Sequence, residues 1–240
     1  MIQRTNIPRQ RPFYIESDGK PMGGTPQHIE NMIYLLEPLN AWFADDPEVF
    51  VPANMFLHYE RGNRNRHVSP DVFVVRGVPK EVRPKRRNYR VWEEGKGPDF
   101  VVELTSETTR EEDRTTKRAI YQDVLGVSEY FLFDPFEEYL HPPLQGCRLT
   151  SGTYRPIRPV KGRLPSRVLG LHLEADGDLL RLYDPAAGRR LPTPPEVFEA
   201  QQREAAARRR AVRARREAEA EAERLRRELE ELRRRLPDNS

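Results

Sequence analysis

The chain has 240 residues, a formal net charge of +3 at pH 7 and 33% charged residues. This length allows one sizeable domain with room for an appendage. The single cysteine, Cys147, excludes an intramolecular disulfide and a cysteine-based metal cluster, and no apolar run is long enough to span a bilayer or serve as a signal peptide. We therefore expect a soluble, cytoplasmic protein.

The positive charge is concentrated near the C-terminus. Between Arg203 and Arg235 there are thirteen Arg and eight Glu, a net of +5, so the remaining residues together carry −2. The basic balance thus comes from the tail, and it does not indicate a nucleic-acid-binding core.

The first predicted element is a helix within TPQHIENMIYLLEPLNAWF. Apolar residues recur there at helical spacing and predict one apolar face, formed by Ile29, Ile33, Leu36, Leu39 and Trp42. Three β-rich runs follow, EVFVPANMFLHY, DVFVVRG and DFVVELTS, and the stretch from Arg61 to His67 between the first two is predicted to be an exposed hairpin tip.

The third run contains a carboxylate, Glu103, among apolar residues typical of a strand buried on both faces. A buried charge is costly unless it is paired, hydrogen-bonded or bound to a metal. Asp71 begins the preceding strand directly after Pro70, so the two carboxylates converge if these strands are neighbours in the sheet. Such a pair suits a hard cation, Mg²⁺ or Mn²⁺.

A second helix is predicted from Thr109, which forms a capping-box pattern with Glu112, to Gly126, which is placed to end it. Asp113, Lys117 and Tyr121 are spaced by four and share one face, and we expect Ile120 and Val124 beside them to pack onto the sheet. Lys117 could then reach over the strand ends and supply positive charge near a phosphate.

EYFLFDP predicts a further buried strand, and the order of helix, three strands, helix and strand indicates an α/β layer on a mixed sheet. The runs GCRLTSGTYRPIRP and LGLHLEADGDLLRLYDP are expected to be hairpins that extend the sheet edge. We place the domain boundary between residues 1–191 and 192–240, where Pro192, Pro194 and Pro195 predict a stiff joint.

The tail is almost purely Ala, Glu, Arg and Leu. Its apolar positions have nearly heptad spacing, with two consecutive intervals of four meeting at Ala218, and they are Ala207, Ala211, Ala214, Ala218, Ala222, Leu225, Leu229, Leu232 and Leu236. Either a single solvated helix with internal Glu–Arg pairs or a dimeric coiled coil fits this pattern. The spaced leucines favour self-association, hence a homodimer.

Several segments resemble, in order, the Uma2 (Uma-two) family, which is classed with restriction endonucleases in the P-D-(D/E)-x-K nuclease superfamily. They are FYIESDGK, TPQHIENMIYLL, SPDVFVV, GPDFVVELTSETTREEDRTTKRAIYQDVLGVSEYFLFDP and RRLPTPPEVF. The resemblance covers about residues 10 to 200. It implies a restriction-endonuclease-like α/β core with a central mixed sheet flanked by helices, extended by the coiled-coil tail, and a Mg²⁺-dependent DNA endonuclease.

The resemblance also implies site residues. Asp71 and Glu103 would be metal ligands, with Lys117 as a displaced catalytic lysine and Tyr121 beside it, and Glu16 and His28 fall on an N-terminal Glu and His of the family. Two departures are evident: Ser106-Glu107-Thr108-Thr109 replaces the family's Ser-Pro-Ser-Thr, and Thr105 stands where the superfamily has its strand lysine.

Each of these residues except Glu103 and Tyr121 also has a purely structural interpretation. Asp71 alone fits a strand-start residue, Lys117 a surface lysine, His28 a hydrogen-bonded structural residue and Glu16 an exposed strand end. At the level of the whole protein, the alternative is a catalytically silent nucleic-acid-binding or adaptor protein that uses the basic tail, and the tail could instead dock a protein partner.

Overall fold

The computed structural model describes Tyr14 and residues 25–81 and 85–235. The chain divides into two compact units, Met1–Leu191 and Pro192–Ser240.

The first unit is built on a six-stranded sheet with the strand order β1-β4-β6-β7-β8-β9. Its central strands β6 and β7 are parallel, whereas the other neighbouring pairs are antiparallel. The sheet is therefore mixed, and the predicted α/β class is confirmed. The strands are β1 (Val49–Phe50), β4 (Val72–Arg76), β6 (Phe100–Leu104), β7 (Glu129–Phe133), β8 (Leu144–Thr150) and β9 (Thr153–Pro156).

Side chains of β6 alternate between two apolar cores, one on each face of the sheet. Phe100, Val102 and Leu104 join the core that includes helix α1 (Pro26–Trp42), and Val101 joins the opposite core. Because successive side chains of a strand point to opposite faces, Glu103 shares the face of Val101. All five residues of β6 are buried, as its apolar pattern predicts.

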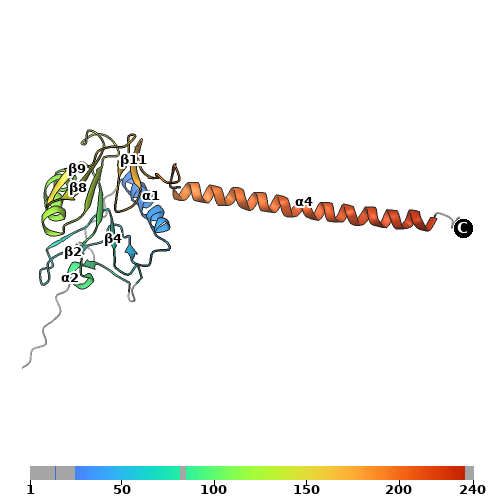
Figure 1. Cartoon of the computed structure of the whole chain (residues 1–240), viewed down its shortest axis with the longest axis horizontal. Coiled ribbons are helices and arrows are strands. Elements are labelled where there is room, and N and C mark those ends of the chain that lie inside the picture. The colour runs from blue at the N-terminus through green and yellow to red at the C-terminus, as the bar shows by residue number, and fades with distance from the viewer. Residues whose placement is uncertain (1–13, 15–24, 82–84, 236–240) are drawn as a thin grey trace, which may run out of the picture. The chain divides into compact units, whose positions relative to one another are not determined.

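Helix α1 forms where predicted, but only part of the predicted apolar face packs on the core. Ile29, Ile33 and Trp42 are 45%, 41% and 39% exposed. The buried positions are Asn31, Leu35, Pro38 and Leu39, of which Leu39 belongs to the predicted face, and Leu36 of that face is partly buried against the core. The helix carries two overlapping apolar sets, and contact with strands β4, β6 and β12 (Leu179–Asp184) selects the second. Figure 1 shows α1 beside β11 (His172–Asp176), the neighbour of β12.

The second predicted helix is only partly α-helical. A single turn, α3 (Arg110–Glu112), leads into two π-helical segments, η1 (Asp113–Lys117) and η2 (Ile120–Val124). The capping box is not formed, because the Thr109 hydroxyl accepts a hydrogen bond from the Ser106 amide instead of capping the helix. π-Helical turns have a wider hydrogen-bond ring than α-helices and often occur near functional sites.

The C-terminal end of this helical region confirms one expectation and corrects another. Gly126 follows η2 with φ of +62°, a left-handed conformation that glycine adopts without a steric penalty. Val124 was expected to pack on the sheet, yet it is 53% exposed. Ile120 and Leu125 are partly buried against the core on that face.

Two smaller sheets complete the first unit. The order β3-β2-β5 contains β2 (Leu57–His58), β3 (His67–Val68) and β5 (Tyr89–Arg90), and the antiparallel β2–β3 pair confirms the hairpin around residues 61–67. A short helix, α2 (Val91–Glu94), follows β5.

The last strands of the unit correct one prediction. The hairpin β8–β9 extends the six-stranded sheet as expected, whereas the later hairpin β11–β12 belongs to a separate sheet. That sheet has the order β10-β11-β12-β13, with β10 (Leu164–Pro165) and β13 (Arg189–Arg190) at its edges. Leucines of β11 and β12 close the core over α1.

The second unit is the helix α4 (Pro194–Arg235), which is continuous over 42 residues. Pro194 and Pro195 lie in its first turn rather than in a joint before it, because proline lacks only an amide donor that the first turn leaves unpaired. The Thr193 amide donates to the Glu196 carboxylate at 2.7 Å and reinforces this helix start. Within the described residues, no helix is both long and apolar enough to cross a membrane.

Candidate active site

The register between β4 and β6 brings two carboxylates together. Val72 pairs with Val102 in this antiparallel ladder, so Asp71 at the start of β4 lies beside Glu103 near the end of β6. The Asp71 amide is 3.3 Å from Oε2 of Glu103 and donates a hydrogen bond to it. The sequence analysis predicted that the two carboxylates converge if their strands are neighbours. The two strands are neighbours in the sheet.

Glu103 is fully buried and contacts side chains from the π-helical region. Its Oε1 accepts a hydrogen bond from the Tyr121 hydroxyl at 2.5 Å. Its Oε2 lies 3.1 Å from Nζ of Lys117. The carboxylate in the strand therefore has the partner that its burial demands, and the partner comes from the following helix.

Lys117 bridges two carboxylates. Its Nζ lies 2.8 Å from Oδ1 of Asp113, one turn earlier in η1, as well as 3.1 Å from Glu103. Asp113 is buried, and its backbone oxygen accepts a hydrogen bond from the Tyr130 hydroxyl at 2.8 Å. The sequence analysis placed Asp113 on one helix face with Lys117 and Tyr121 but did not count it among the site residues. The spacing of Asp113, Lys117 and Tyr121 was the signal of its place in the cluster.

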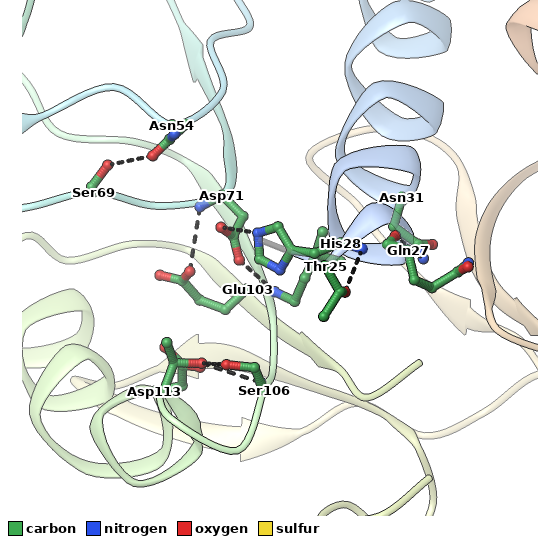
Figure 2. A network of polar contacts seen from close by, with 12 residues as sticks. Thr25, Gln27, His28, Asn31, Asn54, Ser69, Asp71, Glu103, Ser106 and Asp113 are labelled. Carbon is green, nitrogen blue, oxygen red and sulfur yellow. Dashed lines mark hydrogen bonds and ion pairs between the residues drawn. The ribbon is translucent and has the colours of Figure 1, made fainter. Parts of the chain in front are cut away.

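Asp71 is held by groups from two other elements. Its Oδ2 accepts a hydrogen bond from the Leu104 amide at 2.7 Å, and its Oδ1 lies 3.0 Å from Nε2 of His28. Figure 2 shows His28 projecting from α1 toward Asp71, with Glu103 next to it. Thr25 begins this helix as its N-cap and accepts a hydrogen bond from the His28 amide, which fixes the backbone from which the imidazole extends.

The segment before Asp71 is clamped by Asn54. The backbone N–H of Asn54 donates to the backbone oxygens of Pro70 and Asp71. The side-chain Oδ1 of Asn54 accepts a hydrogen bond from the Ser69 hydroxyl at 3.1 Å (Figure 2). Asn54 has φ of +46°, in the left-handed region that asparagine tolerates better than most residues. These contacts fix the chain where it enters β4 and so fix the position of the Asp71 carboxylate. Sequence reasoning missed this clamp.

The cluster has an excess of carboxylates. Burial raises the pKa of Glu103, the charge of Lys117 lowers it, and Asp71 and Asp113 raise it again, so that the pKa lies above its usual range. Burial alone would lower the pKa of Lys117, but Glu103, Asp113 and Asp71 outweigh burial and hold it above its ordinary value. Lys117 is therefore a cation at neutral pH. The hydrogen bond with Asp71 likewise raises the pKa of His28.

The donors fit a hard divalent cation that completes its coordination with water and phosphate oxygens. Asp71 and Glu103 are carboxylates on adjacent strands, and in this cluster three carboxylates interact with one lysine, so added positive charge relieves their repulsion. Among residues 25–81 and 85–235, no group of three or more His, Cys, Asp or Glu is arranged to hold a metal ion. Mg²⁺ commonly uses only one or two protein carboxylates, and Asp71 and Glu103 would supply two.

The structure brings together five of the six residues that the sequence singled out: His28, Asp71, Glu103, Lys117 and Tyr121. Glu16, the sixth, lies outside the described residues. Thr105, which stands where the superfamily has a lysine, is 3% exposed, and its hydroxyl has no hydrogen-bond partner within the described chain. The positive charge beside Glu103 comes from Lys117.

Comparison with known proteins adds a family and a likeness to solved structures. Residues 10–178 match the Uma2 family, described as "Putative restriction endonuclease". No curated protein matches the chain. A crystal structure at 1.96 Å resolution of a protein from Anabaena variabilis ATCC 29413, titled a "putative nuclease belonging to DUF820", is 15% identical, with a TM-score of 0.48 over 65% of this chain and 81% of that chain.

Proposed function

The chain belongs to the Uma2 family, and on this premise we propose that it is a metal-dependent endonuclease that hydrolyses phosphodiester bonds of DNA. The observation that carries the proposal is the position of Lys117, whose ammonium group contacts the buried Glu103 carboxylate beside Asp71. A buried ammonium group held beside two converging carboxylates can stabilise negative charge on a phosphate once those carboxylates hold a cation. The match of residues 10–178 to the family supports a nuclease reaction.

Asp71 and Glu103 would hold the cation, Mg²⁺ with Mn²⁺ as a substitute. When bound, such an ion polarises a phosphate oxygen and makes an attacking water more acidic. Both carboxylates are already oriented by hydrogen bonds, Asp71 by the Leu104 amide and Glu103 by the Tyr121 hydroxyl. Little reorganisation is therefore needed to present their oxygens to a cation.

Lys117 acts as a positive charge rather than as a base. Its raised pKa keeps the ammonium group protonated at neutral pH, so it has no lone pair with which to accept a proton from water. It stabilises negative charge as it accumulates on the phosphoryl oxygens during hydrolysis. Asp113 holds the ammonium group in place from the same helical segment, at 2.8 Å.

Tyr121 and His28 position the carboxylates. The Tyr121 hydroxyl fixes the rotamer of Glu103, and His28 restrains Asp71 from the side of α1. Neither role requires contact with DNA. Loss of either residue should therefore weaken the reaction less than loss of Glu103 or Lys117 does.

The proposal is tested by incubating the purified full chain with supercoiled plasmid in the presence of Mg²⁺, of Mn²⁺, or of EDTA. Conversion to nicked or linear DNA with metal and none with EDTA is the expected result. Single-stranded DNA and RNA of matched sequence, tested in parallel, report whether duplex DNA is the preferred substrate. Absence of metal-dependent cleavage of every DNA substrate would overturn the proposal.

A further inference from the structure

Over residues 207–229, the spacing of the apolar seam of α4 is symmetric about Ala218. Residues at equal distances of four, seven and eleven positions on either side of Ala218 all belong to the seam, and these pairs are Ala214 with Ala222, Ala211 with Leu225, and Ala207 with Leu229. The two consecutive intervals of four, which interrupt a parallel heptad repeat, are the centre of this symmetry. A seam that reads the same from both ends can pair with a second copy that runs in the opposite direction.

The seam lies uncovered in the described chain. From Pro195 to Glu231 every residue of α4 is exposed, and Leu225 and Leu229 are 48% and 55% exposed. Apolar side chains in regular rows gain about 25 cal/mol for each Å² of surface removed from water. A second helix laid along this row would provide that cover.

The charges of α4 have the same mirror relationship, with opposite sign. Residues 205–216 contain six Arg and no acidic residue, a net of +6, and their mirror stretch 220–231 has five Glu and three Arg, a net of −2. Farther out, residues 196–204 carry −2, and residues 233–235 at the other end of the helix are all arginine. Stretches at equal distances on the two sides of Ala218 therefore have opposite net charges. They attract each other when two copies of the helix lie side by side in opposite directions.

We propose that α4 binds α4 of a second copy of this chain in antiparallel orientation, with Ala218 at the centre of the pair. Leu225 of one copy then packs against Ala211 of the other, and Leu229 against Ala207, so that each large side chain faces a small one and the helices stay at an even distance. A parallel pair in register would instead place the +6 stretch of one copy beside the +6 stretch of the other.

Intrahelical ion pairs do not remove the need for a partner. Arg213 with Glu217 and Arg215 with Glu219 form i,i+4 pairs at 2.7 Å, and both have the arginine on the N-terminal side. This order is less favourable than the reverse with respect to the helix dipole, and exposed pairs of this kind contribute only about 0.3 to 0.5 kcal/mol each. They leave the leucines uncovered.

The orientation has a consequence for the proposed nuclease. With a rise of 1.5 Å per residue, the two Pro194 residues of such a pair lie about 70 Å apart along the helix axis. The first units are joined to the pair at these two points. The helix pair therefore holds these two junctions apart.

Spin labels in the full chain, in a Cys147→Ala background, distinguish the orientations. Labels at Gln201→Cys lie about 50 Å apart along the axis of the antiparallel pair, but within about 20 Å in a parallel pair. Labels at Ala220→Cys, close to the centre, are near each other in both. A long distance at 201 with a short one at 220, measured by pulsed electron paramagnetic resonance, is the expected result. Short distances at both positions, or no dipolar signal at either, would overturn the proposal.

A second measurement tests the seam without labels. The double variant Leu225→Lys and Leu229→Lys should shift the mass in solution from dimer to monomer, as measured by analytical ultracentrifugation. Val212→Lys is the matched control, because Val212 is 47% exposed but lies outside the seam, and it should remain a dimer. A monomeric wild type, or a double variant that stays dimeric, would contradict the proposal. Plasmid cleavage is scored separately on the same samples, so the fate of the nuclease proposal is independent of this outcome.

Discussion

Nζ of Lys117 lies 3.1 Å from Oε2 of Glu103, although one residue belongs to a π-helical segment and the other to the central strand of the sheet. Eliminating the lysine charge should therefore affect the reaction and the fold together. We expect Lys117→Met to lower the rate of plasmid cleavage by about 100-fold to 1,000-fold, the range for loss of one group that stabilises transition-state charge. It should also lower the free energy of unfolding by about 3 kcal/mol, because Glu103 and Asp113 lose their cation.

Lys96→Met is the matched control for this variant. Lys96 also forms a close ion pair, with Asp99 at 2.8 Å, but it lies outside the cluster. Its cleavage rate should equal that of the wild type when both are measured well below their unfolding temperatures. A Lys117→Met protein that is folded and fully active would show that the lysine is structural.

Tyr121→Phe removes one hydroxyl from the site and should separate positioning from stability. The Glu103 carboxylate loses the hydrogen bond that orients it, so we expect cleavage to slow by about 10-fold and stability to fall by about 1 to 2 kcal/mol. Tyr154→Phe is the control, since the buried Tyr154 hydroxyl donates to the Val127 backbone oxygen at 3.0 Å on the same face of the sheet. Equal slowing in both variants would count against a positioning role for Tyr121.

Asn31 ties α1 to the β11–β12 hairpin and should be important for stability. It is fully buried, accepts a hydrogen bond from the Leu180 amide at 2.7 Å and donates to the Asp178 oxygen at 2.8 Å. Asn31→Ala removes the acceptor of the Leu180 amide, whereas the Asp178 oxygen keeps a hydrogen bond from the Gln27 side chain at 3.0 Å. We expect a loss of about 2 to 3 kcal/mol in urea unfolding. Asn40→Ala on the same helix, where Nδ2 donates only to the Leu36 oxygen, should cost less than about 1 kcal/mol.

Glu174 gives a pH dependence of known sign. Burial would raise the pKa of its carboxyl group, but hydrogen bonds from Arg190 and Arg163 outweigh burial and lower the pKa. Its stabilising contribution is therefore complete above the unfolded-state pKa of about 4 and is lost as the pH falls through the lower folded-state pKa. Glu174→Gln should lower the melting temperature at pH 7 and show a shallower decrease between about pH 5 and pH 2 than the wild type.

The control for the pH experiment is Glu37→Gln, since Glu37 is exposed on α1. Its melting temperature should follow the wild type at every pH. Parallel curves for the wild type and Glu174→Gln from pH 7 to pH 2 would show that the Arg190 and Arg163 contacts do not stabilise the charged form.

The sequence was most informative about the strand that contains Glu103 and about the position of Asp71 relative to it. An apolar run that contained Glu103, and a proline that placed Asp71 at the start of another strand, predicted converging carboxylates on the condition that the two strands pair, and the structure meets this condition. The spacing of Lys117 and Tyr121 likewise placed them on one side of a helix. The contacts of Glu103 with both residues follow from these two regularities.

Other features depend on contacts that a local pattern does not contain. α1 has two overlapping apolar sets, and contact with distant strands buries Leu35 and leaves Ile29 and Ile33 exposed. The Thr109 hydroxyl can accept a hydrogen bond from an amide in the first helical turn, as in a capping box, or from the Ser106 amide. In the structure it accepts one from the Ser106 amide, so the capping box does not form. Whether the β11–β12 hairpin joins the large sheet or forms its own depends on pairing between strands, which its own residues do not encode.

The measurement that tests the central claim most directly compares Mn²⁺-dependent plasmid cleavage by the wild type and by Glu103→Gln, with a Mn²⁺ thermal-shift titration on the same samples. Glutamine keeps the size of the side chain and an oxygen for Tyr121, but it lacks the charge that a cation needs. We predict that the variant loses both cleavage and the Mn²⁺-induced rise in melting temperature, while Glu37→Gln retains both. A folded Glu103→Gln protein that cleaves DNA and is stabilised by Mn²⁺ as the wild type is would contradict the account.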